Sequence, residues 1–271
     1  MIKSTYGSIT VLTFDRLASF LEIRHFVSTR LGGCSSPPFE SLNIAFHTAD
    51  EPGHVLENRQ RLLAHLGIPL EYLTTAKQVH GNYVAVVTSD MRGSGARDYD
   101  SAVDATDALI TNVSNTCLMV QVADCPPILL YDPANRVIAA VHAGWRGSAQ
   151  FITLRTVRAM VDHFDCQPKD IVACIGPSIG PCCYEVGPEV VDTIRETMGS
   201  LDGLAEPSTS SDRFHLDLWE ANRRQLIEAG IREHNIEVAQ ICTRCKSALF
   251  FSERSCRGTG RFGAGIMLTE Q

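Results

Sequence analysis

His80, Cys125 and His142 are the residues of this chain whose types best suit metal binding or nucleophilic chemistry. Zinc accepts thiolate and imidazole ligands, and three protein ligands leave a fourth tetrahedral position for water or substrate. Copper binds the same kinds of ligand. Alternatively, Cys125 could act as a nucleophile with a histidine as its base and with Asp124 orienting the partner. These roles exclude each other, because a thiolate bound to zinc is poorly available to attack a substrate.

A predicted hairpin joins Cys125 to His142. The segments on either side of residues 132–136 are apolar, and the Asp-Pro-Ala-Asn-Arg sequence between them is typical of a turn. If Tyr131 lies opposite Arg136, then Cys125 lies opposite His142, and directly opposed residues share a face with Cβ atoms roughly 4.5–5.5 Å apart. The two prolines after Cys125 cannot donate to the ladder, and an odd-length loop would put the two side chains on opposite faces. The even register predicts two ligands of one ion.

Glycine-rich segments follow two of the predicted strands. His142 leads through residues 143–148 into a predicted helix, whose N-terminus offers N–H donors to an anion such as phosphate. Arg146 could add a bidentate contact, although the glycines there could equally do no more than shape a tight turn. Residues 175–184 form a second Gly/Pro loop that either lines a pocket or turns a corner. Residues 257–261 lack the Lys-Ser/Thr ending of a P-loop, so a nucleotide P-loop is not expected.

The composition argues against two classes of partner. The 271 residues carry a formal net charge of −7 and no cluster of Lys and Arg, which disfavours nucleic-acid binding. No apolar stretch approaches the roughly 20 residues that span a bilayer. The first residues contain no apolar core of a secretory signal. We therefore expect a cytoplasmic protein without nucleic-acid or membrane partners.

Ten cysteines in such a chain are expected to be buried thiols, metal ligands or nucleophiles rather than disulfides. Cys117 and Cys174 lie in apolar runs and are predicted to be core residues. The adjacent cysteines at residues 182–183 are predicted to be buried and structural, with a redox role as the alternative. Residues 242–245 form a lone C-x-x-C. Because a structural zinc site needs two more ligands and Cys256 does not complete one, no zinc knuckle is predicted there.

Hydrophobic periodicity predicts strands and helices within a single domain spanning residues 1–271. The predicted strands are residues 9–14, 83–88, 108–111, 116–122, 128–131, 137–141, 171–175, 236–241 and 263–268. The predicted helices begin near residues 50, 148, 188 and 217 and end near residues 67, 164, 198 and 230. Residues 90–106 and 199–212 are expected to be long loops. Because strands and helices alternate incompletely, we expect an α+β fold with mixed or antiparallel sheets.

Several short motifs follow one another along nearly the whole chain. They are Ser-Thr-Arg-Leu-Gly-Gly (28–33), Ser-Leu-Asn (41–43), Lys-Gln-Val-His-Gly (77–81), Asp-Ala-Leu-Ile-Thr (107–111), Ala-Asp-Cys-Pro-Pro (123–127), His-Ala-Gly-Trp-Arg-Gly (142–147), Ile-Gly-Pro-Ser-Ile-Gly-Pro-Cys-Cys-Tyr-Glu-Val (175–186) and Thr-Gly-Arg (259–261). In this set and order the chain resembles the YfiH family, also called the laccase-domain or polyphenol-oxidase family. Only Glu-Arg-Ser-Cys at residues 253–256 departs from the expected aromatic-basic run.

The resemblance implies a fold, a metal site and an activity. The fold would be a layered α/β/β/α domain with mixed sheets, like the catalytic domain of cytotoxic necrotizing factor. The metal, usually zinc, would be held by His80, Cys125 and His142, which would also be the catalytic residues. The implied activities are phosphorolysis of adenosine, inosine and methylthioadenosine, and deamination of adenosine. Some bacterial members are implied to remove a misincorporated serine from muropeptide precursors of peptidoglycan.

The first hypothesis is therefore a zinc-dependent purine nucleoside enzyme, with Cu2+ as the alternative metal and a purine nucleoside and phosphate as small-molecule substrates. The residues expected to bind substrate or phosphate, or to orient the ligands, are Arg30, Asn43, Gln78, Asp124 and Arg146. The second hypothesis is an amidase acting on a serine-containing muropeptide precursor, with Cys125 as nucleophile or the metal as Lewis acid. Copper-dependent polyphenol oxidation fits poorly, because multicopper oxidases need many histidines. A metal-binding or partner-binding protein without turnover is the remaining alternative, and the oligomeric state stays open, a homodimer included.

Overall fold

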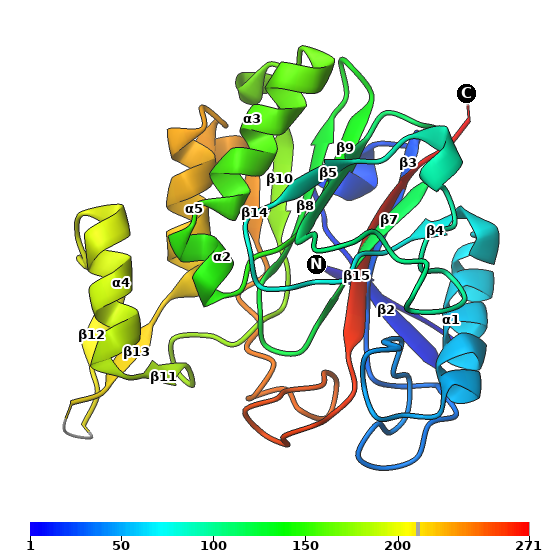
Figure 1. The fold of residues 1–271 in the computed structure, drawn as a ribbon, viewed down its shortest axis with the longest axis horizontal. Coiled ribbons are helices and arrows are strands. Elements are labelled where there is room, and N and C mark those ends of the chain that lie inside the picture. The colour runs from blue at the N-terminus through cyan, green and yellow to red at the C-terminus, as the bar shows by residue number, and fades with distance from the viewer. Residues whose placement is uncertain (210–211, 271) are drawn as a thin grey trace.

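Two six-stranded sheets form the framework of the computed structural model, which describes residues 1–209 and 212–270 (Figure 1). In spatial order, the first sheet contains β1 (Ile2–Tyr6), β2 (Ile9–Thr13), β3 (Ile23–Ser28), β15 (Phe262–Leu268), β7 (Cys117–Val122) and β4 (Leu73–Thr74). The second contains β14 (Ile236–Val238), β10 (Val172–Ile175), β8 (Pro127–Asp132), β9 (Val137–His142), β6 (Ala108–Thr111) and β5 (Val84–Val86). Both sheets are mixed, because β4–β7, β5–β6 and β10–β14 pair in parallel beside antiparallel neighbours. The predicted α+β class with mixed sheets is confirmed.

Helices cover the outer face of each sheet. α1 (Pro52–Leu66) packs on the first sheet through Leu62 and Leu63. α3 (Ile152–Phe164) and α5 (Leu218–Glu228) cover the second sheet, where Val157 and Leu226 enter the core. Figure 1 shows α1, in cyan, and α3, in green, on opposite sides of the sheets. The layers therefore run α/β/β/α.

A smaller group of elements lies beside α5. It contains α4 (Pro188–Met198) and the three-stranded sheet of β11 (Glu185–Val186), β13 (Phe214–Leu216) and β12 (Ala205–Pro207). Val191, Ile194 and Leu216 form its core together with side chains next to α2 (Trp145–Ala149). The group formed by α4 and the small sheet also includes the loop between β10 and β11, which reaches the site described below.

The short 3-10 helices are η1 (Leu17–Ser19), η2 (Leu70–Tyr72), η3 (Ser89–Met91), η4 (Pro168–Asp170) and η5 (Glu233–Asn235).

The space between the two sheets is filled by apolar side chains from both. Leu118 of β7, Leu129 of β8 and Ile138 of β9 are fully buried there. Every residue of these three strands is buried, which explains why their sequences are nearly continuous apolar runs. Burying one such side chain stabilises the fold by roughly 1.5–3 kcal/mol. The well-packed strands give the ends of β8 and β9 fixed positions.

The β8–β9 hairpin forms, but in a different register from the predicted one. Asp132 lies opposite Val137, and Pro127 lies opposite His142. The expected pairing of Cys125 with His142 is therefore wrong by two residues. The physical reason is Asp132, whose carboxylate accepts the backbone N–H groups of Ala134 and Asn135 and so begins the turn one residue later. A shift of two residues preserves the face of each side chain, so the error did not separate the two residues.

The predicted helices occur, with one difference. The helix expected from residue 148 to residue 164 is divided into α2 and α3 at Phe151, whose φ of +62° is incompatible with a continuous helix. α1 ends at Gly67 in the left-handed conformation, as expected for a glycine at that position. The sequence patterns missed β1, β3 and the small sheet. β12 lies inside the segment predicted as a long loop, of which residues 210–211 fall outside the described residues.

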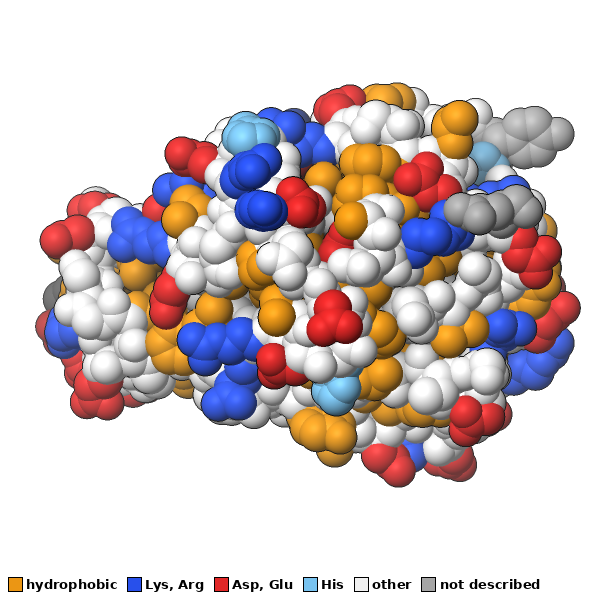
Figure 2. Space-filling model, turned by 90° about the horizontal axis from the view of Figure 1, so that it is seen from above, with side chains coloured by type: hydrophobic (Ala, Val, Ile, Leu, Met, Phe, Trp, Pro, Cys, Tyr) orange, Lys and Arg blue, Asp and Glu red, His pale blue; other side chains and the backbone are white. Residues whose placement is uncertain are grey.

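The visible surface carries charges of both signs. On the face shown in Figure 2, Lys and Arg side chains alternate with Asp and Glu side chains and form no continuous basic area. No helix within residues 1–209 and 212–270 has the length and apolar character needed to cross a membrane.

Candidate metal centre

Three side chains from distant parts of the chain converge at the end of β9. His80 comes from the loop between β4 and β5, Cys125 precedes β8, and His142 is the last residue of β9. One nitrogen or sulfur atom of each lies within 4.8 Å of the other two. The imidazole rings of His80 and His142 meet edge-on, with their centroids 4.7 Å apart. The structure thus brings together the three residues that the sequence predicted as metal ligands.

Asp107, just before β6, holds both histidine-bearing segments. Its buried carboxylate lies 2.7 Å from His142 Nδ1 and accepts the backbone N–H groups of Val79, His80 and Gly81. Burial would raise the pKa of Asp107, but the His142 ring and the backbone N–H groups outweigh it and hold that pKa below its ordinary value. Because Nδ1 of His142 faces Asp107, Nε2 remains as the nitrogen that can bind a metal.

Unusual backbone conformations occur at His80 and at the residue before Cys125. His80 and Asp124 have φ values of +59° and +89°, in the left-handed region that few non-glycine residues adopt. Gly144 follows β9, and a Cβ atom added there would lie 3.0 Å from Cys125 Sγ and 3.1 Å from His80 Cδ2. Glycine at this position therefore lets the sulfur and the imidazole approach each other.

Cys125 and His142 stabilise each other's charged forms. Burial opposes ionisation of Cys125, but the charge and hydrogen bonds of His142 and His80 lower its pKa below the ordinary value. Burial likewise opposes protonation of His142, yet Cys125 and Asp107 raise its pKa. Cys125 is therefore held toward the thiolate, the form of cysteine that binds a metal.

The donor set fits zinc. One thiolate and two imidazoles match the ligand types of tetrahedral zinc sites that keep one position for water or substrate. The Asp107 carboxylate on the far nitrogen of His142 is the kind of partner that fixes the ring of a metal-binding histidine. The contacts of Asp107 connect the two histidine-bearing segments to the start of β6.

The three residues line a cavity of about 470 Å³. The other side chains in its wall include His47, Gln78, Asp124, Trp145, Tyr184, Glu253, Arg254 and Arg261. Cavities of this size suit a small organic molecule. A wider hollow of about 570 Å³ lies along α3, but its lining contains none of the three candidate ligands. Because the three candidate ligands line only the smaller of these two cavities, the smaller cavity is the candidate substrate site.

Two of the five residues predicted to bind substrate, Gln78 and Asp124, line this cavity. The Gln78 amide exchanges two hydrogen bonds with the backbone of Gln121. The Asp124 carboxylate accepts the Thr243 hydroxyl at 2.6 Å and the Arg254 backbone N–H at 2.8 Å. Both side chains thus bind neighbouring parts of the cavity wall and fix their positions.

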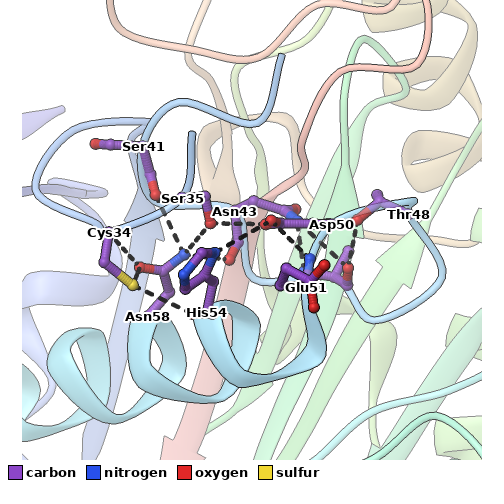
Figure 3. A network of polar contacts seen from close by, with 10 residues as sticks. Cys34, Ser35, Ser41, Asn43, Thr48, Asp50, Glu51, His54 and Asn58 are labelled. Carbon is purple, nitrogen blue, oxygen red and sulfur yellow. Dashed lines mark hydrogen bonds and ion pairs between the residues drawn. The ribbon is translucent and has the colours of Figure 1, made fainter. Parts of the chain in front are cut away.

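Asn43 lies outside the cavity lining, in a buried polar network at the start of α1 (Figure 3). Its amide nitrogen donates to Thr48 and to Asp50, each at 2.9 Å. Its amide oxygen accepts the backbone N–H of Arg261 at 2.9 Å. Asn43 therefore acts on the cavity through Arg261, which does line it.

Arg30 and Arg146 also lie outside the lining of this cavity. Arg30 donates to the backbone oxygens of Glu40 and Ser247. The exposed Arg146 guanidinium lies over the ring of Trp145, 4.5 Å from its centroid. Arg30 thus joins two loop segments, whereas Arg146 covers the ring of Trp145, which lines the cavity.

Several residues in the cavity wall were not predicted as site residues, among them His47, Tyr184, Arg254 and Arg261. Desolvation by the surrounding protein atoms, followed by the nearby positive charges of Arg261 and Arg59, lowers the pKa of the partly accessible His47 below its ordinary value, so its ring is neutral at neutral pH. The Arg254 guanidinium lies 5.0 Å from the Tyr184 ring centroid. Tyr184 falls in the motif of residues 175–186, and Arg254 and Arg261 fall in segments 253–256 and 259–261, whereas no signal marked His47.

The chain matches a protein-family model described as multi-copper polyphenol oxidoreductase laccase over residues 24–269. The crystal structure of the hypothetical protein YfiH from Bacillus licheniformis superposes with a TM-score of 0.91 at 37% sequence identity, covering 97% of both chains. The similarity thus extends over the whole fold, including every segment that contributes to the cavity.

Two relatives carry names that refer to activities. The purine nucleoside phosphorylase YlmD of Geobacillus stearothermophilus is 42% identical over 246 residues, 90% of either chain. The adenosine deaminase RL5 from an unknown prokaryotic organism is 33% identical over 229 residues, 84% of this chain and 87% of that protein. Both names describe enzymes that act on purine nucleosides.

Proposed function

The chain belongs to this laccase-domain family, which includes YfiH and YlmD proteins, and from that premise we propose that it is a zinc-dependent purine nucleoside phosphorylase. The observation that carries the proposal is the convergence of His80, Cys125 and His142 in the wall of a cavity of about 470 Å³. The names of the relatives support purine nucleosides as the substrate class, and the thiolate and imidazole ligands support zinc as the metal.

The reaction replaces one bond at the ribose. An oxygen of phosphate forms a bond to C1′, the N-glycosidic bond breaks, and its electron pair leaves with the purine, which takes up a proton. The protein must therefore hold a dianion on one side of the sugar and a planar base on the other. A zinc ion bound by His80, Cys125 and His142 would supply a positive charge and Lewis acidity at the cavity wall.

Arg254 and Arg261 are the proposed phosphate-binding residues. Both line the cavity. Arg254 donates through Nη1 to the Glu185 carbonyl. Arg261 uses Nη1 for the carbonyls of residues 259 and 260 and for an ion pair with Glu253 at 3.2 Å, so its other N–H donors remain for phosphate. A guanidinium carries five N–H donors in a planar fork that matches phosphate oxygens. The proposal replaces Arg30 and Arg146 in this role, because neither lines the cavity.

His47 and Tyr184 are the proposed contacts of the purine. The His47 imidazole is neutral at neutral pH, so it presents one donor and one acceptor nitrogen to the edge of a base. The ring of Tyr184 forms part of the same cavity wall and offers an apolar surface. Gln78 and Asp124 would orient the surrounding backbone rather than bind the nucleoside directly.

The test is incubation of the zinc-loaded protein with adenosine in the presence and absence of phosphate. We expect adenine and ribose 1-phosphate, formed only when phosphate is present. Cys125→Ala should abolish the reaction, whereas Cys256→Ser, which alters an exposed cysteine away from the cavity, should leave it unchanged. Absence of adenine with zinc and with copper would refute the proposal.

Adenosine deamination is a second candidate activity, favoured by the name of the 33% identical relative. The same incubation distinguishes it, because deamination yields inosine and ammonia without phosphate. Inosine formed by the wild type and lost in Cys125→Ala would assign deamination to this site. No inosine in either case would exclude it.

An amidase acting on a serine-containing muropeptide precursor remains the alternative in which Cys125 is a nucleophile. It is favoured by one observation, the position of the Cys125 sulfur beside two imidazoles. Release of free serine from that precursor by metal-free protein would support it. An unchanged precursor would exclude it.

A further inference from the structure

Four cysteines come together at a second place in the fold. Cys182 and Cys183 lie in the loop between β10 and β11, and Cys242 and Cys245 lie in the segment between β14 and β15. Their four sulfur atoms all lie within 4.8 Å of one another. Cys242 is buried, whereas Cys182 and Cys245 are exposed. The sequence had suggested burial for the adjacent pair, and the exposure of Cys182 corrects that expectation.

The spacing of these sulfurs matches a single tetrahedral ion. Zinc–sulfur bonds of about 2.3 Å in a tetrahedron separate neighbouring sulfurs by about 3.8 Å. The Cys245 sulfur lies 3.7 Å from that of Cys182 and 3.5 Å from that of Cys183. A four-iron cluster binds each thiolate to a different iron, which would spread the sulfurs more widely. The arrangement therefore favours one metal ion with four thiolates.

Backbone contacts hold the two segments in this arrangement. Ser178 and Cys242 form a parallel β-bridge, with Ser178 N–H donating to Ile241 and Thr243 N–H donating to Ser178. The fold itself therefore holds Cys242 beside the loop that carries Cys182 and Cys183.

We propose that Cys182, Cys183, Cys242 and Cys245 bind one zinc ion in a structural site separate from the His80–Cys125–His142 centre. Zinc replaces four thiol protons, which pass to solvent, and the resulting centre carries a net charge of −2. The exposed Arg244 lies in the same segment and adds a positive charge. Two exposed sulfurs give the ion a path of entry.

The proposed site would fix one wall of the catalytic cavity. Thr243, between the two cysteines of the C-x-x-C, donates to Asp124, the neighbour of Cys125. On the other segment, Ile179 N–H donates to the Asp124 carbonyl, and Tyr184 directly follows Cys183 and lines the cavity. A metal that ties the two segments together would therefore limit the movement of Asp124 and Tyr184.

This inference does not depend on the proposed enzymatic activity, because its test measures metal content. Full-length protein, loaded with zinc and freed of excess metal, should contain two zinc ions per chain. The double variant Cys182→Ser/Cys245→Ser should contain one, and so should His80→Ala/His142→Ala. Cys256→Ser is the matched control and should retain two. Equal zinc content in the wild type and the double cysteine variant would overturn the proposal.

A second measurement covers the case in which the double cysteine variant does not fold. X-ray absorption at the zinc edge of His80→Ala/His142→Ala reports the ligands of the remaining ion. The proposal predicts a shell of sulfur alone at about 2.3 Å. Nitrogen or oxygen ligands, absence of zinc, or a disulfide among the four cysteines in protein prepared without oxidant would contradict it.

Discussion

The two cysteine-containing clusters of this protein differ in how they are assembled and in what surrounds them. The first takes single residues from three separate segments, with Asp107 supporting His142, and it lines a cavity. The second takes two pairs from two segments that are already bridged by the backbone, and all four of its ligands are sulfur. A site with three protein ligands keeps a position for substrate, whereas four thiolates close the coordination sphere. This difference is the basis for proposing a catalytic centre at the first cluster and a structural site at the second.

The largest effect is expected when the first cluster loses its sulfur. Cys125→Ala should lower kcat/KM for phosphorolysis by roughly 1,000-fold or more, because Lewis acidity contributes several kcal/mol and each 1.4 kcal/mol corresponds to about a factor of ten. The zinc content should fall by one ion per chain. A variant that keeps both ions and full activity would remove Cys125 from the site.

A smaller effect is expected from the carboxylate behind His142. Asp107→Asn leaves an oxygen for the N–H groups of Val79 and Gly81 but removes the negative charge next to His142 Nδ1. Metal affinity or activity should fall roughly 10- to 100-fold, as is typical for such partners. Zinc competition with a coloured chelator would measure the loss. Unchanged zinc affinity would mean that the Asp107 carboxylate only accepts the backbone N–H groups of residues 79–81 and does not support His142 as a ligand.

Gly144→Ala tests the close approach of the first two ligands. The new methyl group would lie about 3 Å from Cys125 Sγ and His80 Cδ2 and force them apart. We expect metal affinity at the first cluster to weaken about tenfold, since overpacking costs typically 1–3 kcal/mol. The second cluster should keep its ion.

The matched control for this substitution is Gly53→Ala in α1, where an added Cβ meets no atom within 4 Å. It should leave both metal affinities unchanged. Equal effects of the two substitutions would show that the crowding at Gly144 is not the cause.

The smallest effect is expected at the contact between the two clusters. Thr243→Val removes the hydroxyl that donates to Asp124 and should lower the free energy of unfolding by about 1–3 kcal/mol, because a buried acceptor loses its partner. Both metal ions should remain, while kcat falls only a few-fold. Thr243→Ser restores the donor and should recover most of the loss in a denaturant titration. Loss of an ion from Thr243→Val would contradict the view that this contact positions the cavity wall without holding either metal.

Local sequence patterns predicted the frame of the molecule better than its site. β6, β7 and β9 are almost continuous apolar runs because both of their faces are buried, and such runs are visible without a structure. The small sheet of β11, β12 and β13 was missed because strands of two or three residues carry no periodicity. The register of β8 and β9 depended on hydrogen bonds of Asp132 that the sequence does not specify.

The site shows the same division between local and long-range information. Residue types and motif order were enough to nominate His80, Cys125 and His142, whereas the role of Asp107 depends on the pairing of β6 with β9. The four-cysteine cluster was missed because Cys182 and Cys183 are adjacent and do not form a second C-x-x-C. The two pairs are brought together by the β-bridge between Ser178 and Cys242, a long-range contact that sequence spacing does not show.

The most direct test of the proposed catalytic centre is anomalous diffraction at the zinc edge from a crystal of the full chain soaked with a nucleoside. The account predicts a peak bonded to His80, Cys125 and His142, with the purine in the cavity beside His47 and Tyr184. A crystal with no anomalous peak among these three side chains, or with the nucleoside bound elsewhere, would contradict it.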